Sequence, residues 1–234
     1  MNVKATIRDY WDKRSESYDR SPGHVCLPEL WKSILNDVFE DMARILDVGT
    51  GTGFLASLLA ELGHEVVGLD ISKGMLNVAR RKTKVDFVLG DAESLPFKDE
   101  SFDAVICRHL LWTLPNPGRA ISEWVRVARE MVVIIDGKWM TNNFRSKLRR
   151  FLGRLLVGIY ERRNPFEPIH YGRYLLPFYG GISADIVIEM LRSAGLKVKV
   201  LDLSWLRKRM GEKLPFAYRI AWTSDDYFMI VGFV

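Results

Sequence analysis

The stretch ILDVGTGTG, residues 45–53, decides the fold of this chain. An apolar run ends in the acidic Asp47, three glycines then occur at every second position, and an apolar helix-like pattern begins at Phe54. This order predicts a strand, a tight glycine turn and the start of a helix. Glycine adopts positive φ and has no Cβ, so a ligand can lie directly against such a turn. The helix N-terminus adds free N–H groups and the positive end of a dipole, which suit a carboxylate or a phosphate.

The spacing of the glycines helps to choose between ligands. A dinucleotide-binding turn follows the pattern G-x-G-x-x-G, which would put its third glycine at position 54. That position is Phe54, and the third glycine is Gly53. Asp47 would repel a pyrophosphate, but its carboxylate could pair with an ammonium group. An amino acid attached to a nucleoside therefore fits better than a dinucleotide, and a tight turn without a ligand is the alternative.

Apolar runs and helix-like segments alternate along the chain. The predicted strands are residues 44–48, 65–69, 86–89, 102–107, 131–135, 197–201 and 227–233. The predicted helices are residues 27–39, 53–62, 74–81, 117–129 and 184–194. Strands that read as continuous apolar runs between helices indicate a parallel sheet covered on both faces. The fold class is therefore α/β, with a doubly wound, Rossmann-like sheet.

Polar residues follow four of the predicted strands, at the edge of the sheet where open α/β folds bind ligands. Asp70 lies 21 residues after Gly49, about the distance at which an acidic residue reaches the ribose hydroxyls in a nucleotide fold. Asp91 and the backbone N–H of Ala92 could read the amino edge and a ring nitrogen of adenine. Arg108 and His109 follow the fourth strand. Solvated acidic residues at strand ends are common, but three in order (Asp47, Asp70 and Asp91), together with a glycine turn, point to a nucleoside site.

At these positions the chain resembles the class I S-adenosylmethionine-dependent methyltransferases of the ubiquinone/menaquinone-methyltransferase-like, small-molecule type. The resemblance covers roughly residues 44–136 and rests on the segments LDVGTGTG (46–53), GLDIS (68–72), GDAESLPF (90–97) and SFDAV (101–105). It implies a seven-stranded sheet whose last strand is antiparallel. One departure is the sequence AREM at residues 128–131, where family members usually carry a glycine pair.

The resemblance also implies roles for individual residues, with S-adenosylmethionine as the cofactor. The turn formed by Gly49, Thr50, Gly51, Thr52 and Gly53, read with Asp47, would hold the methionine moiety. Asp70 would bind the ribose, Ile71 and Met75 would pack beside adenine, and Asp91 with Ala92 would read its edge. The segment YWDKRSESYD, residues 10–19, resembles the family's opening, in which Tyr18 would fold over the cofactor. Arg108 would contact the cofactor carboxylate or an anionic substrate.

Methyl transfer from a sulfonium needs alignment of the nucleophile and exclusion of water more than it needs a catalytic triad. A base is required only if the attacking atom carries a proton, and His109 is the candidate for that role. The alternative is that His109 only lines the pocket or hydrogen-bonds a loop. His24 and His170 could approach the pocket if their segments form lids.

The amino-acid composition limits which classes of protein this chain can belong to. The chain has 234 residues, is 48% hydrophobic and carries only Cys26 and Cys107, so neither a disulfide scaffold nor a cysteine metal cluster is expected, and no metal site is assigned. No run approaches the roughly 18 apolar residues of a membrane span, and the charged N-terminus does not resemble a signal peptide. A cytoplasmic protein is expected.

We expect one domain in four parts: an N-terminal arm with helices (1–40), a cofactor-binding core (41–136), a basic aromatic lid insertion (137–183) and the remainder of the sheet (184–234). Residues 137–180 hold nine Lys/Arg and two Glu, a net charge of +7 in a chain whose total is +5. Seven apolar residues of this insertion fall on one helical stripe (Phe144, Leu148, Phe151, Leu152, Leu155, Leu156 and Ile159). The insertion could cover an acceptor site, or it could be a packed helix with solvated charges.

Three functions are compatible with the sequence. The first is methyl transfer to a small molecule by in-line displacement, with a small-molecule substrate as partner. The second is the same chemistry on RNA or protein through the basic insertion, although no RNA-binding module is recognisable and no DNA is expected as a partner. The third is a non-catalytic protein that holds the cofactor or a membrane surface through a basic amphipathic helix.

Overall fold

The computed structural model describes residues 2–138, 144–161, 176–221 and 226–234. A single sheet of seven strands forms its centre, in the order β3-β2-β1-β4-β5-β7-β6. The strands are, in chain order, β1 (Arg44–Val48), β2 (Glu65–Asp70), β3 (Asp86–Leu89), β4 (Phe102–Arg108), β5 (Ala128–Gly137), β6 (Lys197–Asp202) and β7 (Tyr227–Phe233). Strand β7 is antiparallel to both β5 and β6, and the pairs among β1 to β5 are parallel. The predicted sheet, with its antiparallel last strand, is confirmed.

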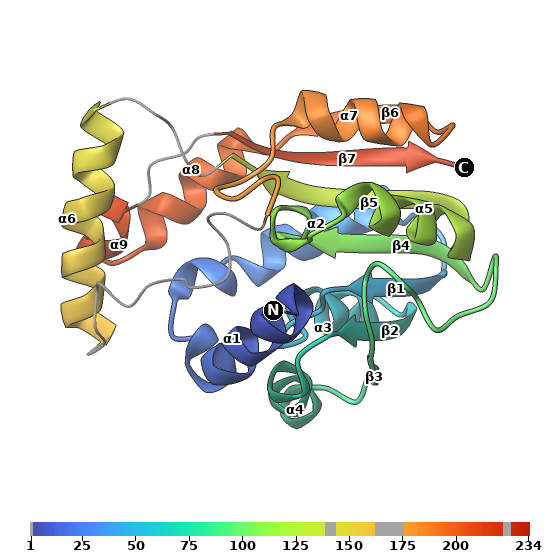
Figure 1. The fold of residues 1–234 in the computed structure, drawn as a ribbon, viewed down its shortest axis with the longest axis horizontal. Coiled ribbons are helices and arrows are strands. Elements are labelled where there is room, and N and C mark those ends of the chain that lie inside the picture. Colours follow the sequence, from blue (N-terminus) through green and yellow to red (C-terminus); the bar gives the residue numbers. More distant parts are fainter. Residues whose placement is uncertain (1, 139–143, 162–175, 222–225) are drawn as a thin grey trace.

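Helices surround this sheet (Figure 1). They are α1 (Val3–Tyr18), α2 (Pro28–Val38), α3 (Phe54–Glu61), α4 (Lys73–Lys82), α5 (Pro117–Val127), α6 (Phe144–Glu161), α7 (Ala184–Ser193), α8 (Ser204–Lys213) and α9 (Phe216–Ala221). Two short 3₁₀ helices are η1 (Pro22–His24) and η2 (Leu111–Thr113). The sequence prediction missed α8 and α9.

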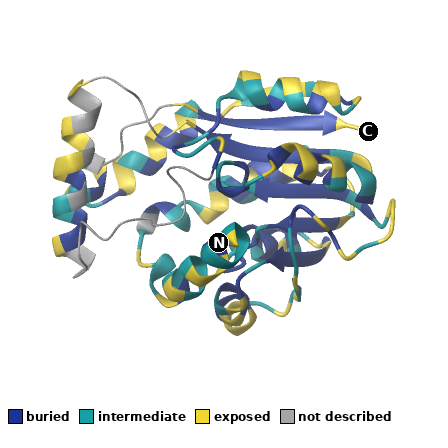
Figure 2. Ribbon diagram, in the orientation of Figure 1, coloured by how far each residue is buried: buried dark blue, intermediate teal, exposed yellow. Residues whose placement is uncertain are grey.

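The alternation of side chains along each strand divides the core into two layers. In β4, Ala104 and Ile106 pack with α2, α3 and α8, whereas Val105 and Cys107 pack with α5 and α7. Figure 2 shows the strands as the buried centre of the molecule. Because both faces are covered by helices, the strands could be apolar throughout, as their sequences indicated.

Local capping explains where several helices begin. Ser72 precedes α4 and its hydroxyl accepts a hydrogen bond from the backbone N–H of Met75, while Asn116 accepts one from Arg119 at the start of α5. At its other end α5 runs directly into β5, because Val127 ends the helix and Ala128 begins the strand. The AREM segment therefore forms the start of β5 where the family usually has a glycine pair.

The strand order changes direction between β1, which leads into the glycine turn, and its neighbour β4. Open α/β sheets bind ligands at such a switch point, outside the carboxyl ends of the strands. Helix α6 lies beyond this end of the sheet, beside α9, and apart from the two helical layers (Figure 1). Residues 139–143 and 162–175 of the predicted lid insertion lie outside the described residues, and so does His170.

Candidate functional site

The glycine turn has the strained geometry that its sequence predicted. Gly49, Gly51 and Gly53 have φ values of 69°, 56° and 80°, a region that L-residues with a side chain rarely adopt. A Cβ on Gly49 would also lie 2.7 Å from a methyl carbon of Leu110. Position 49 therefore requires glycine both for its backbone conformation and for its space.

Hydrogen bonds to neighbouring elements fix the turn. The backbone N–H groups of Gly49 and Thr50 donate to the carbonyl of Leu69 at 2.7 and 3.0 Å. The Thr50 hydroxyl donates to the Asp47 carboxylate at 2.6 Å. Asp47 is 2% exposed, and burial raises its pKa to about 6. It lies behind the turn and supports it from the core.

A cleft opens at this edge of the sheet. Most of the predicted cofactor-binding residues line it: Tyr18, Gly49, Gly51, Asp70, Ile71, Met75, Asp91, Ala92 and Arg108. Asp47, Thr50, Thr52 and Gly53 do not line it. Gly53 instead precedes α3, and the Thr52 hydroxyl donates to Asp19 at 2.8 Å, so these residues hold the turn and its neighbours together.

Asp70 connects the end of β2 to the glycine turn. One carboxylate oxygen accepts a hydrogen bond from the Gly51 N–H at 2.9 Å, and the other accepts one from the Ser72 N–H at 2.9 Å. Burial raises the pKa of Asp70 to about 6, against the lowering effect of these hydrogen bonds. Each oxygen has a second lone pair, so the carboxylate can accept hydroxyl donors from a ligand in the cleft.

Asp91 and Ala92 lie at the end of the cleft beyond β3. The Asp91 carboxylate forms an ion pair with Lys4 of α1 at 2.6 Å, and Lys4 also pairs with Glu93 at 2.6 Å. The carbonyl of Ala92 accepts a hydrogen bond from the Trp124 indole, whereas its N–H meets no acceptor among the described residues. The predicted N–H donor of Ala92 is therefore available to a ligand, while Asp91 shares its charge with a lysine.

Arg108 extends from the end of β4 between aromatic rings. Its guanidinium carbon is 4.5 Å from the centre of the Phe54 ring and 5.3 Å from that of Trp31. One terminal nitrogen donates to the His24 carbonyl at 2.6 Å, and the other is buried without a hydrogen-bond partner in the described part of the chain. A cation placed in this way can receive a carboxylate.

His109 follows Arg108 and has φ +59°, an uncommon value for a residue with a side chain. It lines the cleft, and its Nε2 is in hydrogen-bond contact with the hydroxyl of Tyr227 at 3.1 Å. Burial, with the charges of Arg108 and Arg207, holds the pKa of His109 well below its usual value near 6.5. The imidazole is therefore neutral at pH 7.

Helix α1 covers the cleft, as the resemblance implied for the segment that contains Tyr18. The Tyr18 ring stacks on His24 with centroids 4.0 Å apart, so His24 approaches the site. Asp12 accepts hydrogen bonds from the Ser72 hydroxyl at 2.6 Å and the Gly74 N–H at 2.8 Å, which attaches α1 to the start of α4. The cover is built from side-chain contacts between distant parts of the chain.

Sequence reasoning missed several residues of the cleft. Lys4, Ile7 and Trp11 of α1 line it, and so do Leu110, Thr113, Leu114 and Pro115 after β4. Trp11 lies in the segment 10–19 that resembles the family's opening, but the partners of Lys4 are 87 and 89 positions away in the chain. A positive charge that faces two carboxylates so far away in the chain cannot be recognised from local spacing.

Metal sites and membrane-spanning helices were searched for in the described residues. These residues contain no cluster of His, Cys, Asp and Glu that could hold a metal ion. Within the same residues, no helix is both long enough and apolar enough to cross a membrane.

Comparisons with known proteins agree with this geometry. Residues 46–135 match the family described as a methyltransferase domain. The demethylmenaquinone methyltransferase of Renibacterium salmoninarum is 40% identical over 123 residues, which are 51% of this chain and 52% of that protein. The protein of the same name from Thermotoga maritima is 30% identical over 165 residues, or 66% of this chain and 70% of that protein.

Among solved structures, the magnesium protoporphyrin IX methyltransferase of Synechocystis with bound SAH has the same fold, with a TM-score of 0.63 at 18% identity and 99% of each chain covered. The chain spans about half the length of the first curated relatives that it matches. The predicted resemblance is confirmed, and the chain belongs to the class I S-adenosylmethionine-dependent methyltransferases.

Proposed function

We propose that this protein transfers a methyl group from S-adenosylmethionine to a small-molecule acceptor. One observation carries the proposal: residues from five separate segments, each predicted to touch the cofactor, converge on a single cleft at the switch point of the sheet. These segments are the end of α1, the glycine turn, the end of β2 with α4, the Asp91–Ala92 pair and the end of β4.

The residues of the cleft fit the parts of the proposed cofactor. Asp70 can accept ribose hydroxyls, and the unpaired N–H of Ala92 can donate to a ring nitrogen of adenine. The buried unpaired nitrogen of Arg108 suits the methionine carboxylate. A Cβ on Gly51 would meet no atom within 4 Å, so the turn leaves space on its open side for the ligand to approach the backbone.

S-adenosylmethionine supplies an electrophilic methyl group on its sulfonium. The chain then has to orient the acceptor in line with that methyl and keep water out, and positioning of this kind contributes about 7–11 kcal/mol in favourable cases. Trp11 and Tyr18 of α1 lie over the cleft and supply the cover that excludes water. Their aromatic rings border an acceptor of apolar or aromatic character.

His109 is better suited to positioning than to acting as a strong base. Burial and two nearby arginines disfavour its protonated form, so its imidazole would be a weak base toward the acceptor. Its neutral ring can instead hydrogen-bond a polar group of the acceptor while Tyr227 holds its orientation. We assign His109 to acceptor positioning, with the acceptor atom left to the experiment below.

The test is a transfer assay with methyl-labelled S-adenosylmethionine and a panel of quinols, phenols, thiols and amines. The proposal expects label on at least one acceptor class, and loss of transfer in Asp70→Ala but not in Asp103→Ala. Asp103 is a matched aspartate outside the cleft, where it pairs with Arg129. Cofactor binding without transfer to any small molecule, together with transfer to RNA or to a protein, would overturn the small-molecule assignment.

A further inference from the structure

Glu93 is a buried carboxylate in the cleft to which the proposed function gives no role. It is 3% exposed, follows the Asp91–Ala92 pair directly and lines the cleft with it. One of its carboxylate oxygens accepts a hydrogen bond from the backbone N–H of Asn116 at 2.6 Å. The other pairs with the ammonium group of Lys4 at 2.6 Å. A buried carboxylate needs such partners, and Glu93 takes them from two segments that are far apart in the chain.

The contact with Asn116 fixes the segment that follows β4. We call residues 110–116 the acceptor wall, because they continue from His109, which is assigned above to acceptor positioning. Four residues of this wall line the cleft: Leu110, Thr113, Leu114 and Pro115. At one end, the His109 N–H donates to the Ile135 carbonyl at 2.9 Å. At the other end, the Asn116 N–H donates to Glu93, so this carboxylate sets the position of the end of the wall.

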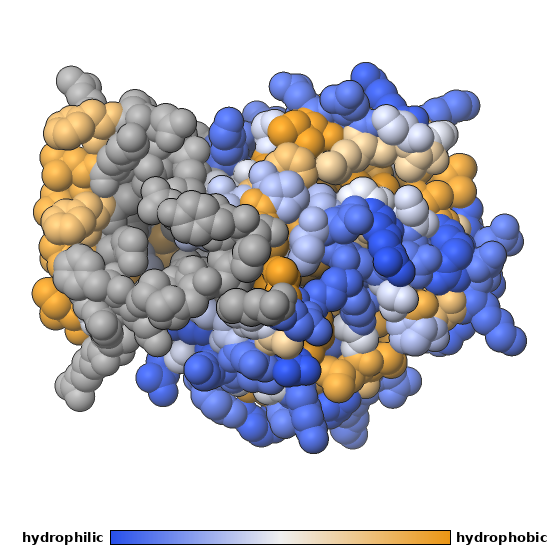
Figure 3. Space-filling view, in the orientation of Figure 1, coloured by the Kyte–Doolittle hydropathy of each residue, from blue (hydrophilic) through white to orange (hydrophobic). Residues whose placement is uncertain are grey.

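Lys4 connects the same carboxylate to the cover. The exposed residues of α1 are all charged, and Figure 3 shows the surface over this helix as largely hydrophilic. Lys4 instead lines the cleft, where it pairs with both Asp91 and Glu93. The Asp91 carboxylate also accepts a hydrogen bond from the Glu93 N–H at 2.9 Å. The cover, the pair proposed to read adenine and the acceptor wall therefore meet at Glu93.

Glu123 offers a comparison from the same loop. Its carboxylate accepts a hydrogen bond from the Leu95 N–H at 2.8 Å and pairs with Arg126 at 2.9 Å, so it too joins a backbone N–H to a cation. Glu123 reaches the loop from α5, however, and does not line the cleft. Either carboxylate can stabilise the loop after β3, but only Glu93 ties this loop to the cover and to the acceptor wall.

We propose that Glu93 is a positioning residue, which holds the acceptor wall in place when the cofactor occupies the adenine end of the cleft. The proposal rests on the proposed function, because it concerns the acceptor of that reaction. A cofactor held by Asp91 and Ala92 restrains the turn that carries Glu93, and Glu93 passes this restraint to Asn116. The acceptor then meets a wall that is already ordered, which raises its affinity. Glu93 acts through Asn116 and needs no contact with the acceptor.

Hydrogen exchange of the full chain, followed by mass spectrometry, tests this connection without an acceptor. In the unmodified chain, S-adenosylhomocysteine should slow exchange about fivefold or more, both in the glycine turn (49–53) and in the acceptor wall (110–116). In Glu93→Ala the glycine turn should still be protected, whereas the wall should exchange as fast as without ligand. Glu93→Gln keeps an oxygen for the Asn116 N–H and should restore most of the protection. Glu123→Ala is the matched control and should keep the protection of both segments.

Steady-state kinetics with the acceptor that the transfer assay labels give a second readout. Glu93→Ala should raise KM for the acceptor about tenfold, while kcat and the affinity for S-adenosylmethionine change by less than about threefold. Glu93→Gln should lie between Glu93→Ala and the unmodified chain. A carboxylate that only stabilises the loop would not separate the two substrates in this way.

The outcomes of the exchange experiment distinguish this proposal from the proposed function. Ligand protection of the glycine turn without protection of the wall in the unmodified chain would overturn the role of Glu93 and leave cofactor binding intact. The same holds if the wall is protected in Glu93→Ala, or if Glu93→Ala and Glu123→Ala lose equal protection. No protection of the glycine turn in the unmodified chain would contradict cofactor binding itself, and both proposals would then be wrong.

Discussion

Helices α1 and α6 both lie outside the two helical layers of the sheet, and they differ in how much of their surface the chain itself covers. Ile7 of α1 is 5% exposed and packs with Leu176 and Tyr179. Polar residues of α1 pair with the loop after β3 and with the start of α4. On α6, by contrast, Phe144 and Ile159 are 79% and 74% exposed. The sequence places both helices outside the sheet, but only the structure shows how firmly the chain holds α1.

The comparison predicts that the cleft beneath α1, and not the surface of α6, controls cofactor affinity. Asp70→Ala should weaken S-adenosylmethionine binding by about 100-fold, since two charge-assisted hydrogen bonds of about 1.5 kcal/mol each are lost. Calorimetric titration measures this effect. Phe144→Gln/Ile159→Gln should bind the cofactor as the unmodified chain does, and an equal loss in both variants would contradict the separation of the two regions.

A matched pair of isoleucines tests the packing of the two helices. Ile7→Ala should lower the free energy of unfolding by about 2 kcal/mol, because it leaves a cavity beside Leu176. Ile159→Ala should lower it by less than about 0.5 kcal/mol, since that side chain is already in solvent. Urea unfolding followed by fluorescence measures both, and equal losses would mean that α1 is no better packed than α6.

The pH dependence of binding should arise from the cleft as well. Asp70 accepts hydroxyl donors best when ionised, and its pKa is raised to about 6 by burial. Cofactor affinity should therefore fall as the pH drops below 6, to about a tenth at pH 5 of its value at pH 7. Asp47 has a pKa of about 6 too, so Asp70→Asn should reduce this dependence without abolishing it. A constant affinity between pH 7 and pH 5 would exclude ionised Asp70 from the site.

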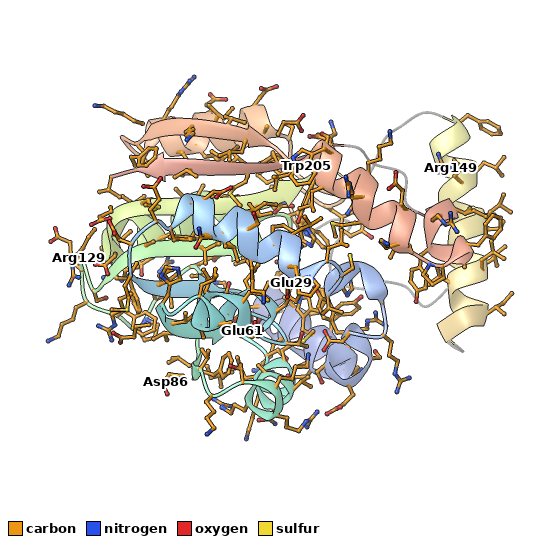
Figure 4. The ribbon with its side chains drawn as sticks, turned by 180° about the vertical axis from the view of Figure 1, so that it is seen from behind. Glu29, Glu61, Asp86, Arg129, Arg149 and Trp205 are labelled. Carbon is orange, nitrogen blue, oxygen red and sulfur yellow. The ribbon has the colours of Figure 1, made fainter. Side chains whose placement is uncertain are left out.

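The smallest expected effect concerns the ion pairs that attach α1. Lys4→Gln removes the pairs with Asp91 and Glu93 and should speed cofactor dissociation by about threefold, because the cover opens more often. Lys32→Gln is the control, since Lys32 also pairs with two carboxylates, Glu29 and Glu61, but does not line the cleft. Figure 4 labels both glutamates in the view from behind. Stopped-flow release should be unchanged in the control; a similar change in both would point to a general effect of charge.

The sequence predicted the sheet and the glycine turn because both depend on local signals. The strands 44–48, 86–89 and 227–233 have the same bounds in the structure as in the prediction. Helix α8 was not predicted, since its ten residues are largely polar and show no clear apolar period. The exposure of α6 could not be predicted either, because a stripe at helical spacing is the same whether it meets a core, a partner or solvent.

The residues of the site also fall into those that the sequence predicted and those that it did not. Asp70, Asp91 and Arg108 lie at or just beyond strand ends, and they were predicted from that position, the spacing after the glycine turn and the family resemblance. Lys4 was not, because its two carboxylate partners become neighbours only when α1 folds over the cleft. Asp47 was expected to meet the ligand but lies behind the turn, where the Thr50 hydroxyl occupies one of its oxygens. Spacing identifies which residues reach the edge of a sheet, and packing decides which of them face the cleft.

A comparison of two glycines tests most directly whether the turn holds the cofactor. Gly51 and Gly63 both have positive φ (56° and 95°), and a Cβ on either would meet no atom within 4 Å. Alanine should therefore destabilise both turns by a similar amount, about 1–2 kcal/mol. Only Gly51 lines the cleft. Titration with S-adenosylmethionine should show about a tenfold or greater loss of affinity for Gly51→Ala and a change within about twofold for Gly63→Ala. Equal affinity in the two variants would contradict the assignment of the Gly49–Gly53 turn to the cofactor.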